Sequence, residues 1–293
     1  MADSHSIALA APAAGPRVPW MQRLAATPPW TPWRLAAAIA AVLFAAFFAV
    51  EWITGRLEIV FGPDVGAHAE TARVNFRITL VMIPLFAYLP AAFADGARSA
   101  RRATADLAPH LRASPGETAA IVEQAGRFDP VALRRAGWIG VFFAVLIPIW
   151  IDRQLEAWVI WRHASEAIAQ RVLLPPVGWF AARFIYSLWA ESRRLSQIGR
   201  SLVAVDLLDA RRFAPLTRQG LRYALLTIGV LSILAFYLFD YAKKGLFAVV
   251  LLAGAIALVA AASALLLPLR GARDAIAAAK RAELDWCDAE LRR

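Results

Sequence analysis

The sequence has little of what a water-soluble enzyme needs. Only 18% of its 293 residues are charged and 60% are hydrophobic, whereas a soluble domain carries about a quarter charged residues. Its four histidines are scattered, and none stands in a cluster with metal-ligand spacing. The single cysteine, Cys287, cannot form a disulfide within the chain and suggests a reducing compartment. These shortages exclude an ordinary soluble enzyme, and we expect no cofactor, no metal and no enzymatic activity.

The apolar residues are concentrated in stretches that are almost free of charge. With their Trp, Tyr and Arg flanks they are long enough to cross a hydrocarbon layer about 30 Å thick, since a helix rises about 1.5 Å per residue. The stretches are residues 35–53, 78–94, 136–151, 172–190, 223–239 and 245–269. The pattern predicts an all-α, polytopic transmembrane helical bundle of six spans at residues 34–269, with helical cytoplasmic extensions. Residues 1–33 are predicted to be a disordered cytoplasmic tail, and residues 270–293 a cytoplasmic C-terminal helix.

Basic residues are divided unevenly between the segments that join the predicted spans. The two termini and the second and fourth loops hold 23 Lys and Arg, the other loops hold 8, and Arg183 lies inside a span. Because positive charge accumulates in cytoplasmic loops, we expect both termini in the cytoplasm and the bundle in the plasma (inner) membrane. The same charge favours anionic lipid headgroups as partners, so the net charge of +10 requires no nucleic acid.

Local signals predict two helices on the cytoplasmic side. Ser114 and Glu117 have the spacing of a capping box and predict a helix from Pro115 to about Arg127. After the fourth span, residues continue at alternating steps of three and four, which is the spacing of a helix seam. We expect this span to continue as a helix packed within the chain, in preference to a dimer stalk. The seam is Leu188, Glu191, Leu195, Ile198, Leu202, Val205 and Asp209.

Alanines repeat every four residues in the first and last spans. They are Ala37, Ala41, Ala45 and Ala49, then Ala253, Ala257 and Ala261. Small residues at this spacing let helix backbones approach closely. We expect both helices to make tight contacts, within one chain or between chains.

Three segments toward the C-terminus carry a resemblance to known sequences. They are Arg200–Asp209, Phe213–Arg218 leading into a span, and the closing Pro268–Gly271 with Lys280 further on. Together they resemble a pattern in uncharacterised multi-pass prokaryotic inner-membrane proteins, over about the last third of the chain. No activity is assigned to that family. The resemblance implies a multi-pass membrane protein and transfers no functional residue.

Five charged residues are the candidates for a functional role. Asp206 and Asp209, with Arg200 and Arg218 nearby, predict a charged collar at the cytoplasmic membrane edge. Arg183 lies near the middle of the fourth span, where a guanidinium costs about 2.5–3.5 kcal/mol. We therefore expect Arg183 to face the protein interior or an aqueous cavity.

Two classes of function agree with these features. The first is a non-enzymatic membrane module whose cytoplasmic helices bind a protein partner, self-associate or transmit a signal. The alternative is a small transporter or channel in which Arg183 lines a polar cavity, and Pro84, Pro90 and Pro148 would loosen helices around it. A membrane enzyme is the weakest hypothesis, because the spans offer Ser, Thr and Tyr without an accompanying His or Asp.

Overall fold

The computed structural model of the chain describes residues 31–63, 66–154, 164–201, 213–236 and 247–293. Within these ranges it contains helices and no strand, which confirms the all-α prediction for this part of the chain. The helices are α2 (Pro32–Ile53), α3 (Arg56–Phe61), α4 (Ala67–Leu107), the 3-10 turn η1 (Ala108–His110), α5 (Pro115–Gln124), α6 (Pro130–Gln154), α7 (Ala164–Ser201), α8 (Ala214–Ala235) and α10 (Phe247–Leu291).

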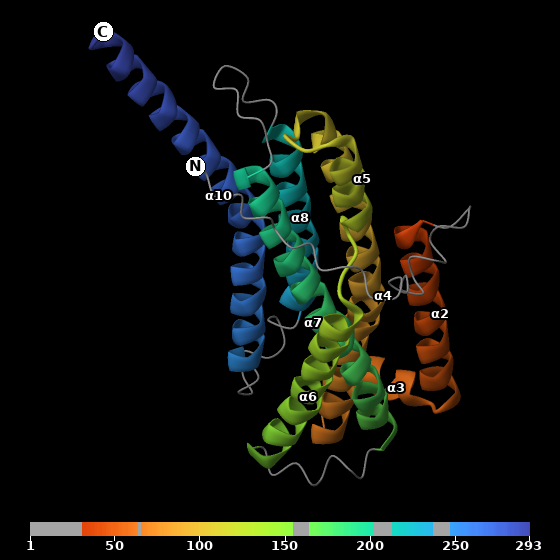
Figure 1. The fold of residues 1–293 in the computed structure, drawn as a ribbon. Helices are drawn as coiled ribbons and strands as arrows, with labels where there is room; N and C mark the ends of the chain where they lie inside the picture. The colour runs from red at the N-terminus through yellow and green to blue at the C-terminus, as the bar shows by residue number, and fades with distance from the viewer. Residues whose placement is uncertain (1–30, 64–65, 155–163, 202–212, 237–246) are drawn as a thin grey trace.

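The long helices form an up-and-down bundle with α4 and α7 at its centre (Figure 1). α7 packs against α4, α6 and α10, while α4 also packs against α2 and α8. Among the described residues, three helices have segments long and apolar enough to cross a membrane, in α2, α4 and α10. These helices fit a membrane protein. The predicted fifth span runs past the described end of α8. Of the predicted tail at residues 1–33, residues 1–30 lie outside the described chain, whereas Pro32 and Trp33 already belong to α2.

Glycines bring α6 and α7 into backbone contact. A Cβ on Gly140 of α6 would lie 2.0 Å from the carbonyl oxygen of Gly178 on α7. A Cβ on Gly137 would lie 2.7 Å from the Trp179 ring. Only small residues permit so close an approach. The contact also sets which residues of the two antiparallel helices lie at the same level.

The alanine stripes of the first and last predicted spans behave differently. In α10, Ala257 and Ala261 are buried, as expected for a packing face. In α2, by contrast, the stripe from Ala37 to Ala49 is exposed in this chain. α2 packs through Ala36 against the Ala87 and Ala91 region of α4 instead.

The predicted extension of the fourth span is confirmed as far as the described chain reaches. α7 continues to Ser201, and its seam residues Leu188, Glu191, Leu195 and Ile198 are all buried within the chain. The last three seam positions lie outside the described residues. The seam is therefore covered by the chain's own helices where it can be seen.

α10 is one helix of 45 residues that runs through the predicted boundary at residue 270. Pro268 has no N–H to donate to the carbonyl of Ala264, and the Ser192 hydroxyl of α7 donates to that oxygen instead, at 3.5 Å. Figure 1 shows that α10 changes direction and then leaves the bundle, a bend typical of proline. Ala275 is buried, whereas residues 280–293 are exposed.

Candidate functional site

Polar residues are buried where α4, α7 and α8 meet. Glu191 and Ser192 of α7 and Gln219 and Tyr223 of α8 are almost inaccessible, although an apolar core surrounds them. Buried polar groups are costly unless they are hydrogen-bonded. We name Ser99, Glu191, Gln219 and Tyr223 the junction site and consider how each is held.

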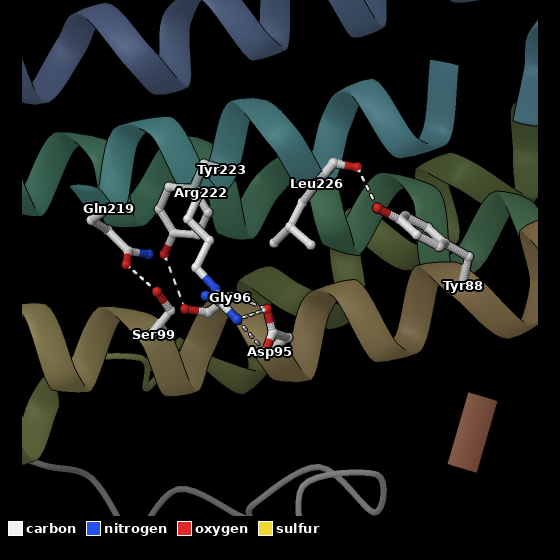
Figure 2. Close-up of polar contacts among 8 residues, drawn as sticks. All are labelled: Tyr88, Asp95, Gly96, Ser99, Gln219, Arg222, Tyr223 and Leu226. Carbon is white, nitrogen blue, oxygen red and sulfur yellow. Dashed lines mark hydrogen bonds and ion pairs between the residues drawn. The ribbon is translucent and has the colours of Figure 1, made fainter. Parts of the chain in front are cut away.

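α4 and α8 are joined by a row of polar contacts (Figure 2). Arg222 forms a bidentate ion pair with Asp95, with N–O distances of 2.8 to 3.0 Å. One residue on, the Tyr223 hydroxyl donates to the carbonyl oxygen of Gly96 at 3.4 Å. The Ser99 hydroxyl donates to Oε1 of Gln219. Arg222 and Tyr223 lie three and four residues after Gln219, so the three side chains share one face of α8.

Glu191 is the acidic residue of the junction site, and it is almost completely buried. Its side chain is 1% exposed, and Oε2 lies 3.7 Å from Nη1 of Arg194. Glu191 follows the predicted span 172–190, and burial raises the pKa of its carboxyl group. Arg194, a hydrogen bond from the backbone of Gly126 and the charge of Arg101 oppose that rise. Burial has the largest effect, which favours the neutral carboxyl.

Two buried atoms of the junction site lack a hydrogen-bond partner among the described residues. They are Oε1 of Glu191, an acceptor when ionised, and Nε2 of Gln219, a donor. Figure 2 shows the Gln219 amide directed toward the Tyr223 hydroxyl, and the two groups interact. The Tyr223 hydroxyl also interacts electrostatically with Glu191. The acceptor and the donor therefore both lie close to one tyrosine.

The end of α5 is clamped against this junction. Arg101 of α4 donates to the carbonyl of Ala125 at 3.0 Å, and Arg194 of α7 donates to the carbonyl of Gln124 at 2.5 Å. Gly126 then turns the chain with a φ of 68°, and a Cβ there would lie 2.3 Å from the carbonyl oxygen of Ala97. Cations at a helix C-terminus stabilise its unpaired carbonyls. The two arginines and Glu191 thus hold the segment 124–126 in place.

Arg183 lies between aromatic rings. Its Cζ is 5.8 Å from the ring centre of Phe93 and 5.5 Å from that of Trp179, within the range of cation–π attraction. Its Nε is buried without a hydrogen-bond partner among the described residues. Because α6 and α7 are antiparallel and Gly137 lies beside Trp179, Arg183 is level with Arg134 at the charged start of α6. Its neighbours among the described residues include no acidic partner for a relay.

The predicted charged collar is described only in part. Arg200 forms an ion pair with Asp274 of α10 at 2.5 Å, and both side chains are exposed. Arg218 is exposed on α8. Asp206 and Asp209 lie outside the described residues. The contact seen at Arg200 ties the end of α7 to α10, and exposed pairs of this kind contribute up to about 1 kcal/mol.

Several residues of the junction were not candidates on sequence grounds. Asp95, Gln219 and Arg222 lie just outside predicted spans, where polar residues are common. Their contacts between α4 and α8 depend on tertiary packing, which the sequence pattern does not reveal. Glu191 was noted only as a seam position. Among the described residues, no group of three or more His, Cys, Asp and Glu could hold a metal ion. Comparison with protein-family models, curated proteins and solved structures found no match.

Proposed function

We propose that this protein is a non-enzymatic, six-span inner-membrane module with cytoplasmic termini, which presents the end of α10 to a protein partner. The distribution of basic residues, 23 against 8, supports this orientation. The exposed apolar side chains of the bundle support a lipid environment, because they lie on its outer helices. Examples are Val42 and Phe48 of α2, Phe142 and Leu146 of α6, Leu225 and Ile228 of α8, and Leu258 and Val259 of α10.

The observation that carries the proposed function is the unpacked end of α10. The helix leaves the bundle after Ala275, and the turns that follow touch no other described element (Figure 1). Leu284, Trp286 and Leu291 are exposed there. No other described element covers these apolar side chains, so a partner that buries them would stabilise this end of the helix.

The pattern of this segment matches a known mode of helix recognition. Ile276, Leu284, Cys287 and Leu291 are separated by eight, three and four residues, which places them on one side of the helix. Amphipathic helices with such anchors bind in apolar grooves of their partners. Lys280 lies on the same side of the helix, four residues from both Ile276 and Leu284, and Glu283 lies at its edge, so the groove is expected to carry charges of both signs.

Site-specific photo-crosslinking of the full-length protein in its native membrane tests this proposal. A photoreactive residue at Leu284 should yield an adduct of one defined mass, whereas the same residue at Ala289, on the opposite side of the helix, should not. Leu291→Glu should abolish the adduct at position 284. Equal adducts at both positions, or none, would contradict the proposal. An adduct of twice the monomer mass would identify a second copy as the partner.

Transport is the second candidate, favoured by the buried polar junction and by Pro84 and Pro90 inside α4. The aromatic neighbours of Arg183 do not provide the polar lining expected of a pathway at that residue. Cysteine in place of Arg183, in a chain with Cys287→Ser, tests it. Reaction with a small water-soluble thiol reagent in intact membranes would support an aqueous cavity. Protection from the reagent would count against one.

A further inference from the structure

Glu191 is a buried acid inside a closed junction. It contacts Arg194 only at 3.7 Å through Oε2, and Oε1 has no hydrogen-bond donor among the described residues. An ionised oxygen buried without a donor is strongly unfavourable.

The charged and titratable groups around Glu191 come from each element of the junction. α4 contributes Arg101, α7 contributes Arg194, and α8 contributes the Tyr223 hydroxyl. Arg222, next to Tyr223 in the sequence, forms an ion pair with Asp95, so these two charges compensate each other. The carbonyl of Ala264 on α10 is taken up by Ser192. The turn after α5 adds the backbone N–H of Gly126.

These surroundings select the kind of ligand. Arg101 donates a hydrogen bond to the carbonyl of Ala125, and Arg194 donates one to the carbonyl of Gln124. These hydrogen bonds are therefore not made to the carboxyl group of Glu191. Their positive charge nevertheless disfavours a metal cation beside Glu191. A proton needs no further ligands, and it removes the buried charge. The side chain of Arg194 is 32% exposed and leads from Glu191 to solvent.

We propose that the junction site is a proton-binding site, in which Oε1 of Glu191 takes up a proton from solvent beside Arg194. When this proton is lost, the carboxylate of Glu191 attracts Arg194 and Arg101. This attraction competes with the hydrogen bonds that the two arginines donate to the carbonyls of Gln124 and Ala125. The charge on Glu191 thereby sets how the segment 124–126 is held. This inference does not rest on the proposed docking of α10.

Infrared spectroscopy of the full-length protein in lipid nanodiscs, over a pH series, tests the proposal directly. The wild type should show the carbonyl band of a protonated carboxyl group that persists to a higher pH than the band of an exposed carboxyl group. Glu191→Gln should remove the band. Glu123→Gln changes an exposed glutamate near the same turn and is the matched control, which should keep it. Absence of the band from the wild type, or its persistence in Glu191→Gln, would overturn the proposal.

Thermal unfolding over the same pH series gives a second measurement. Because the folded state favours the neutral carboxyl, stability from this group is complete at low pH and is lost as pH rises through the pKa of Glu191 in the folded protein. The melting temperature of wild type and Glu123→Gln should fall there, while Glu191→Gln should not show that fall. If Glu191→Gln does not fold, Glu191→Asp must shift the infrared band, and an unshifted band would overturn the proposal.

Discussion

At the scale of single residues, Gly229 controls the contact between α4 and α8. The Tyr88 hydroxyl donates to the carbonyl of Leu226 at 2.9 Å, and a Cβ on Gly229 would lie 2.1 Å from that hydroxyl. Gly229→Ala should destabilise the protein by about 1–3 kcal/mol, because overpacking outweighs the better helix propensity of alanine. Thermal unfolding in detergent measures the effect.

The matched control for this substitution is Gly254→Ala in α10, where an added Cβ meets no atom within 4 Å. That variant should be as stable as the wild type or slightly more stable. Equal melting temperatures for the two variants would contradict the packing argument at Gly229.

Arg183→Leu separates a structural role from a functional one. The side chain is held by two rings and has an unpaired buried Nε, so an apolar replacement should keep the free energy of unfolding within about 1 kcal/mol of the wild type or raise it. Arg193→Leu, at an exposed arginine 4.7 Å from the Trp189 ring centre, is the control and should also be neutral. Thermal unfolding of both variants provides the measurement.

A loss of several kcal/mol in Arg183→Leu would show that the guanidinium has an essential structural partner. If the variant folds but no longer gives the crosslink at Leu284, Arg183 acts in signalling. If fold and crosslink both survive, the arginine has neither role, and its position level with Arg134 would let it reach the headgroups.

Residue-level prediction succeeded where the cause is local. Ser114 accepts from the backbone of Glu117 at 3.3 Å, and Glu117 accepts from the backbone of Ser114 at 2.9 Å, as the capping-box spacing predicts. Asp95 and Arg222 are far apart in the sequence, so their ion pair could not be predicted from a single sequence. Candidates at Asp206 and Asp209 stay predictions, because they lie outside the described residues.

At the scale of elements, the start of α5 depends on this capping box. Hydrogen bonds from the backbone and side chain of Ser114 lower the pKa of Glu117. Their stabilising effect is therefore complete above the pKa that Glu117 has in the unfolded chain, and it is lost as pH falls through the pKa in the folded protein. We expect α5 to fray at its N-terminus in acid, and amide hydrogen exchange of residues 115–124 should report it.

Ser114→Ala should produce the same fraying at neutral pH, at a cost of about 1 kcal/mol to the helix. Glu123→Gln, whose exposed pair with Arg127 lies at the other end of α5, is the control and should leave exchange at the N-terminus unchanged. Slow exchange at the first turn in Ser114→Ala would disprove the role of the cap.

Element boundaries were less predictable than the existence of the elements. The predicted span 245–269 and the predicted helix 270–293 form one continuous helix, α10, because neither Pro268 nor Gly271 ends a helix that α7 supports. α5 ends at Gln124 and not near Arg127, since Gly126 adopts a left-handed conformation that stops the helix. Glycine contacts between α6 and α7 depend on tertiary packing and were not predicted.

At the scale of the whole molecule, the proposed orientation can be tested with the native cysteine. Cys287 is exposed on α10 and should react with a membrane-impermeant thiol reagent only after the cells are permeabilised. Cysteine in place of Thr54, at the exposed end of α2 in a Cys287→Ser chain, should react in intact cells. Gel shift of the labelled protein measures both.

Cysteine in place of the exposed Glu117 serves as the control for the cytoplasmic side and should behave as Cys287 does. Labelling of Cys287 in intact cells, or protection of the residue 54 variant, would refute the six-span orientation. If both results were reversed, the six spans would have the opposite orientation. If only one were reversed, the number of crossings between residues 54 and 287 would be even instead of the five expected.

The bend in α10 gives the helix the mechanics of a lever. From Pro268 to Leu291 the helix extends about 35 Å at helical rise, so a tilt of about 10° near Pro268 would move the tip by about 6 Å. The pivot lies where the Ser192 hydroxyl donates to the carbonyl of Ala264, and Ser192 directly follows Glu191 in the sequence. A small shift of α7 at this point would therefore be amplified at Leu284 and Leu291, far from where the shift occurs.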